Sequence, residues 1–111
     1  MMDRKSPPRV ELLWFADCPN HEAARESVRA ILDEVAPEAE FTDLDASDPT
    51  LAARLHFPGS PTVRVNGVDV EPGFADPGDY TPRCRLYRID GRLARTPDPG
   101  WIRDAVVAGG R

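Results

Sequence analysis

The sequence predicts an α/β sandwich with a mixed β-sheet, and three observations carry this prediction. Residues 10–16 are almost wholly apolar and do not alternate, which is typical of a central strand covered on both faces. Residues 24–35 repeat apolar side chains at the spacing of one helix face. The dipeptide Asn66-Gly67 separates two short valine-rich runs, which indicates an antiparallel hairpin. The central strand therefore gains parallel neighbours through helical crossovers, and the hairpin supplies an antiparallel edge.

The remaining elements extend this pattern to the order β-α-β-α-β-β-α. The first helix opens near Pro19, because proline is tolerated in a first helical turn, and Pro37 ends it. A second strand covers residues 40–44. Asp48 reads as the N-cap of a short second helix, which ends by residues 57–59.

The hairpin register follows from its turn. It places Val65 opposite Val68 on one face and Arg64 opposite Asp69 on the other. Apolar side chains therefore pair on one face and opposite charges on the other, which supports this register. Residues 71–83 contain three prolines and two glycines and read as a long loop. Loops of this length in a compact domain are often functional.

The last third of the chain predicts one further strand and a helix. Residues 84–89 look extended and leave room for an extra strand, followed by a turn at Asp90-Gly91. A final helix starts at Asp98-Pro99.

Length and charge limit the classes of function. A chain of 111 residues is one domain, which we place at residues 10–108 behind a frayed tail of residues 1–9. The net charge of -5 argues against a nucleic-acid partner, and no apolar stretch approaches a membrane span. The tail lacks the apolar middle of a signal peptide, so we expect a cytoplasmic protein. We also expect a monomer or a weak dimer.

Cys18 is the leading candidate for chemistry. It lies between the apolar strand and the first helix, where free N–H groups of Asn20 and His21 and the helix dipole would stabilise a thiolate. His21 would add to this effect if protonated, or would carry a proton. Asp17 opposes the stabilisation of a Cys18 thiolate, since a nearby carboxylate disfavours a thiolate. The alternatives are a small buried cysteine that happens to precede a helix, and a surface histidine.

Cys18 before a helix, followed by a Ser-Pro-Thr before a hairpin, resembles the thioredoxin superfamily over about residues 10–108. The resemblance implies a thioredoxin-like fold with a cis proline against the cysteine. Residues 18–21 read Cys-Pro-Asn-His rather than Cys-x-x-Cys, so no disulfide closes within the motif. Related bacterial sequences carry the labels thioredoxin-like or alkylmercury lyase, although nothing here indicates carbon–mercury cleavage. The resemblance assigns the cis bond and substrate binding to Ser60, Pro61 and Thr62.

Cys84 is the second candidate. The resemblance returns the segment after the hairpin to the end of the sheet that holds Cys18, so Cys84 would approach it as a resolving thiol. The alternative is a strand cysteine without a partner. Arg83 and Arg85 flank Cys84 and would favour its thiolate or bind an anionic thiol, but we favour a solvated pair of arginines. His56, at the end of the second helix, reads as structural.

Three functions remain open. The first is a cofactor-free thiol redox protein, with Cys18 as nucleophile and Cys84 as resolving thiol, acting on protein or small-molecule thiols and disulfides. The second is a protein that binds a soft metal ion such as copper, zinc or mercury through Cys18, His21 and Cys84. The third is a thioredoxin-like binding module without chemistry, because a fold does not dictate function.

Overall fold

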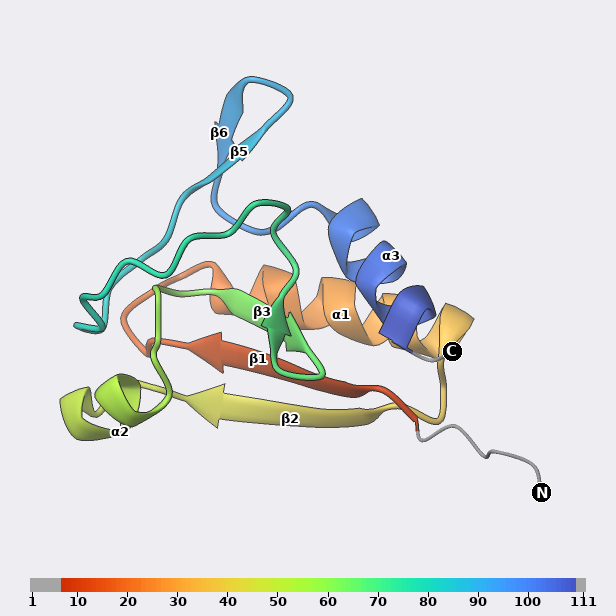
Figure 1. Cartoon of the computed structure of the whole chain (residues 1–111), viewed down its shortest axis with the longest axis horizontal. Coiled ribbons are helices and arrows are strands. Elements are labelled where there is room, and N and C mark those ends of the chain that lie inside the picture. Colours follow the sequence, from red (N-terminus) through yellow and green to blue (C-terminus); the bar gives the residue numbers. More distant parts are fainter. Residues whose placement is uncertain (1–6, 110–111) are drawn as a thin grey trace.

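The computed structural model describes residues 7–109 and confirms an α/β architecture with a mixed sheet (Figure 1). In these residues a four-stranded sheet is combined with three helices and a separate two-stranded hairpin. The elements in order are β1 (Arg9–Trp14), α1 (His21–Val35), β2 (Glu40–Asp45), α2 (Pro49–Arg54), β3 (Thr62–Val65), β4 (Val68–Asp69), β5 (Tyr87–Ile89), β6 (Arg92–Ala94) and α3 (Pro99–Gly109).

The sheet has the order β2-β1-β3-β4, with β1 parallel to β2 and antiparallel to β3. The apolar run is therefore a central strand, as predicted. It ends at Trp14 instead of residue 16, because the Ala16 amide donates to the Ser47 hydroxyl at 2.9 Å and leaves the ladder. The carboxyl ends of β1 and β2 lie at the end of the sheet where α2 and the loop of residues 71–83 are also found (Figure 1).

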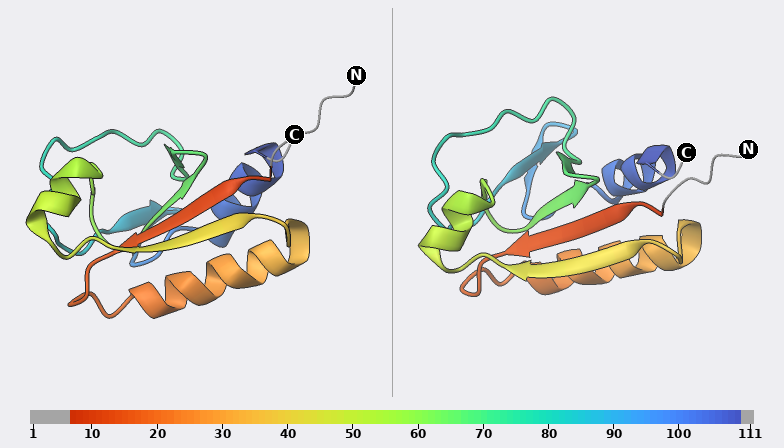
Figure 2. Two further views of the ribbon diagram at one scale, coloured as in Figure 1. Left: turned by 90° about the horizontal axis from the view of Figure 1, so that it is seen from below. Right: turned by 60° about the horizontal axis from the view of Figure 1, so that its bottom comes forward.

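The two faces of β1 pack against different helices, which explains why its sequence does not alternate. Val10 and Leu12 join the main core with α1 and α3, and Figure 2 shows α1 running along that face of the sheet. Leu13 points the other way and packs with Ala52 of α2 and with Phe57. Full burial of these side chains supplies the hydrophobic stabilisation of the sheet.

The β3–β4 hairpin has the predicted register. Val65 lies opposite Val68 and Arg64 opposite Asp69, and the turn residues Asn66 and Gly67 have φ values of 52° and 84°. Positive φ at both positions is what a type I′ turn requires, and asparagine followed by glycine satisfies it at low cost.

Helix starts and the N-terminal boundary differ in detail from the predictions. The N-cap of α1 is Asn20, so Pro19 precedes the helix instead of occupying its first turn. Asp48 caps α2 as predicted, accepting from the Thr50 amide at 2.9 Å. Arg9 belongs to β1, so the predicted tail is too long by its last residue, while residues 1–6 lie outside the described part.

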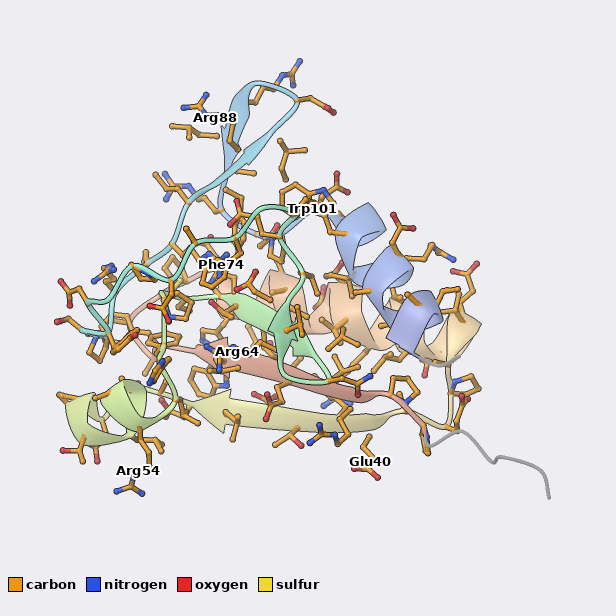
Figure 3. The ribbon with its side chains drawn as sticks, viewed as in Figure 1. Glu40, Arg54, Arg64, Phe74, Arg88 and Trp101 are labelled. Atoms are coloured by element: carbon orange, nitrogen blue, oxygen red, sulfur yellow. The ribbon has the colours of Figure 1, made fainter. Side chains whose placement is uncertain are left out.

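The extra strand expected near residues 84–89 is present in part as β5, which pairs with β6 instead of joining the four-stranded sheet. Cys84 forms an isolated parallel bridge with Ser60. The β5–β6 hairpin turns at Asp90-Gly91, as predicted, and Arg88 lies on it away from the sheet (Figure 3). Within residues 7–109, no helix combines the length and apolar character needed to cross a bilayer.

Candidate functional site

Cys18 lies in the turn between β1 and α1. Its amide donates to the Phe15 carbonyl at 2.9 Å, which turns the side chain back toward the sheet. The residue has 0% of its surface exposed. Neighbouring residues therefore cover the sulfur of Cys18.

The sulfur of Cys18 is surrounded by polar partners. It lies 3.6 Å from the Ser60 carbonyl oxygen and 3.7 Å from Nδ2 of Asn20. Burial by itself raises the pKa of the Cys18 thiol, but hydrogen bonds from the Ser60 side chain, the Asn20 backbone, Cys84 and the Asn20 side chain outweigh burial and hold this pKa below the ordinary value. A low pKa is the direction expected for a reactive thiol.

Two of these donors were missed by the sequence analysis. The Ser60 hydroxyl is buried and has no hydrogen-bond partner in the described residues, which leaves it available to donate to the sulfur. The Asn20 side chain reaches the sulfur from two residues along the chain. An asparagine two residues after a cysteine is a local signal that could have indicated this contact.

Cys84 lies beside Cys18. The Ser60 amide donates to the Arg83 carbonyl at 2.7 Å and the Arg85 amide donates to the Ser60 carbonyl at 2.8 Å, so residues 83–85 bracket Ser60. Both thiols are free, and Cys84 is exposed. The hydrogen bond to Cys18, with burial and the thiolate charge adding to it, raises the pKa of Cys84, while the charge of Arg95 acts against this rise.

Ser60, Pro61 and Thr62 support the site from inside. The Ser60–Pro61 bond is cis, as the resemblance implied. All three residues are fully buried. Thr62 donates to the Gly59 carbonyl at 2.6 Å and accepts from Arg85 at 2.8 Å. Their polar groups are engaged within the protein or directed at Cys18.

Arg85 is the residue whose role the sequence analysis got wrong. It is 8% exposed instead of solvated. Its guanidinium contacts Asp69 at 2.7 Å and Glu71 at 2.8 Å. It also lies 4.4 Å from the Tyr87 ring centroid and 5.0 Å from that of Phe74, which the loop carries over β3 (Figure 3). This network attaches the Cys84 segment to the β3–β4 hairpin.

Gly59 permits the close approach of that segment. A Cβ atom at this position would lie 2.7 Å from the Cβ of Arg85, which is too close for two carbon atoms. Its φ of 128° is also rarely adopted by residues with side chains. Glycine is therefore required for the backbone of residues 84 and 85 to reach Ser60.

His21 does not join the two thiols. Its ring stacks on Trp14 with centroids 4.5 Å apart, and its Nδ1 is buried without a hydrogen-bond partner. In the described part of the chain, no three Cys, His, Asp or Glu side chains converge in a way that could hold a metal ion. The expected metal site of Cys18, His21 and Cys84 is therefore not formed.

His56 lies outside this site. It follows α2 with a φ of 52°, stacks on Tyr80 at 4.6 Å and contacts Asp76 at 3.5 Å. The predicted structural role of His56 agrees with these contacts, which attach the loop of residues 71–83 to the end of α2.

Comparison with known proteins adds no further assignment. No protein-family model matches the sequence, and no curated protein does either. The two free thiols at Ser60, those of Cys18 and Cys84, are the chemically reactive groups of this site.

Proposed function

We propose that this chain is a thioredoxin-like thiol–disulfide redox protein whose redox centre is the pair Cys18 and Cys84. The observation that carries the proposal is the convergence of two free cysteines on Ser60: the Cys18 sulfur lies 3.6 Å from the Ser60 carbonyl oxygen, and Cys84 forms a parallel bridge with Ser60. The pKa of the Cys18 thiol is lowered and that of the Cys84 thiol is raised, which favours one as thiolate and the other as thiol. This is the arrangement from which thiolate attack and resolution through a disulfide proceed.

The surroundings of the pair support the same function. The Asn20 side chain, whose Nδ2 lies 3.7 Å from the Cys18 sulfur, stabilises a thiolate there as an attacking or a leaving group. The strand order, the helix after Cys18 and the cis Ser60–Pro61 bond agree with the resemblance to the thioredoxin superfamily. We propose protein or small-molecule thiols and disulfides as the reaction partners. The reducing cytoplasm is the proposed compartment, since it can return the pair to its reduced form.

The test is the intact mass of the purified protein before and after mild oxidation. The wild type is expected to lose two hydrogens, and thiol-specific reductant is expected to restore them. The variants Cys18→Ser and Cys84→Ser should each show no such loss. If the wild type keeps both thiols available for alkylation after oxidant that fully oxidises a control dithiol, the proposed function is wrong.

A further inference from the structure

The two thiols differ in their access to solvent. Cys18 is 0% exposed, whereas Cys84 is exposed beside it. We propose that substrate sulfur reacts at Cys84, with Cys18 as the internal partner, and that the preferred substrates are anionic disulfides and thiols. This inference rests on the proposed function and reverses the order of attack that the resemblance implies.

The backbone explains why Cys84 faces outward. Residues 84–87 are extended, so alternate side chains point to opposite sides. Arg85 and Tyr87 are buried, while Cys84 is exposed and Leu86 is 56% exposed. A substrate therefore meets Cys84 next to an exposed leucine. An incoming sulfur cannot approach Cys18 in the same way, because Ser60 and Asn20 lie against its sulfur.

Because Cys84 is exposed, its thiol exchanges its proton directly with solvent. The Cys84 proton is lost to solvent. The Cys84 thiolate then attacks one sulfur of the substrate disulfide. A mixed disulfide forms at Cys84, the substrate S–S bond breaks, and the second substrate sulfur leaves as a thiolate with the electron pair.

Resolution completes the reaction. The departing thiolate takes a proton from solvent, Cys18 loses its proton to solvent, and the Cys18 thiolate attacks the Cys84 sulfur. The Cys18–Cys84 bond forms, the mixed disulfide breaks, and the second substrate thiolate leaves and takes a proton from solvent. The substrate disulfide is reduced by two electrons and the protein pair is oxidised by the same two electrons. In the reverse direction a reducing thiolate attacks Cys84, and Cys18 departs as a thiolate stabilised by its donors.

Charge near Cys84 gives the substrate class. Arg95 is exposed and directly follows Ala94, which pairs with Tyr87 in the β5–β6 hairpin, so the hairpin register brings Arg95 close to the Cys84 segment. Its charge acts to lower the pKa of Cys84. A positive charge beside the reacting sulfur attracts anionic reagents and repels cationic ones. Oxidised glutathione, which is anionic, is therefore expected to react several times faster than the cationic disulfide cystamine. Arg95→Gln should reduce this ratio, and Arg92→Gln, on the outer strand β6, should leave it nearly unchanged.

The site of reaction is tested by mapping where the first adduct forms. Reduced wild type is treated briefly with less than one equivalent of iodoacetamide, and the modified cysteine is identified by peptide mass. Cys84 is expected to be modified about tenfold or more faster than Cys18 in the folded protein, with nearly equal rates in urea. In Cys18→Ser, oxidised glutathione should give a stable mixed disulfide on Cys84.

Several outcomes would overturn the inference. Faster modification of Cys18 in the folded protein would assign attack to the covered thiol. An absence of glutathione adduct on Cys84 in Cys18→Ser, in protein shown to be folded by circular dichroism, would do the same. Equal reaction rates for glutathione disulfide and cystamine would exclude a preference for anionic substrates. If one of these outcomes is found and the wild type still forms its internal disulfide, the proposed function holds although the inference fails.

Discussion

Cys18 and Cys84 carry the same side chain in opposite surroundings. Cys18 is covered and accepts several hydrogen bonds that lower its pKa, whereas Cys84 is exposed and its pKa is raised by its hydrogen bond to Cys18. Thiolate character and accessibility, which usually coincide at a reactive cysteine, are divided here between two residues. The comparison teaches that the proposed chemistry depends on two cysteines with different properties, one exposed and one covered.

The two surroundings are also held in place differently. The position of Cys18 depends on a local turn, with contacts between residues 15 and 20. The position of Cys84 depends on residues distant in the sequence, namely Ser60 and the ion pairs of Arg85. Changes in the Arg85 network should therefore separate the thiols while leaving the Cys18 turn intact.

Arg85→Ala is expected to have the largest effect. It leaves the Asp69 carboxylate, whose side chain is 3% exposed, without its partner, and loss of one partner of a buried pair costs about 3–5 kcal/mol. Urea unfolding measures this loss, and intact mass measures internal disulfide formation. Arg92→Ala, at an exposed position of β6, is the matched control and should change stability little. An Arg85→Ala protein as stable as the control would contradict the importance of this network.

Gly59→Ala should have the next largest effect, because the new methyl group collides with the Cβ of Arg85. We expect a loss of about 1–3 kcal/mol and slower formation of the Cys18–Cys84 bond. Gly73→Ala is a suitable control, since Gly73 also has positive φ but no atom within 4 Å of its added Cβ. The difference between the two variants in urea unfolding reports the steric contact apart from the backbone strain. Equal losses would show that the close approach of residue 85 is unimportant.

Ser60→Ala tests the Cys18 side of the comparison and has the smallest expected effect. Removing the hydroxyl donor should raise the pKa of Cys18, because one group that favours the thiolate is lost. The onset of thiolate ultraviolet absorbance, followed in Cys84→Ser to isolate Cys18, should move to higher pH. Ser27→Ala in α1 serves as the control and should leave the titration unchanged. A shift to lower pH would show that Ser60 is not a net donor to the thiolate.

Much of the fold was predictable because its signals are local. The turn residues Asn66 and Gly67 specify their hairpin through the φ values they tolerate, and the side chain of Asp48 caps α2 within two residues. The register of β3 with β4 follows from the turn length alone. The separate β5–β6 hairpin was only partly predictable: its turn was clear, but its failure to join the main sheet depends on contacts outside its own sequence.

The candidate site was predictable in its cysteines but not in their environments. The position of Cys18 before a helix is visible in the chain, whereas its complete burial requires Ser60 to pack against it from 42 residues away. The sequence analysis expected Arg85 to be solvated, because the acidic partners Asp69 and Glu71 belong to another segment. Long-range pairs of this kind leave no periodic pattern along the chain.

The sequence by itself determined the order of strands and helices, the central place of β1 and the presence of a cysteine at a helix start, because these follow from side-chain periodicity and turn chemistry over a few residues. Only the tertiary structure decided that Cys18 is covered, that Cys84 faces solvent and that the two cysteines meet at Ser60. Those properties arise where Gly59 lets a distant segment approach Ser60 and where Arg85 holds it. They therefore depend on the packing of segments that are far apart along the chain.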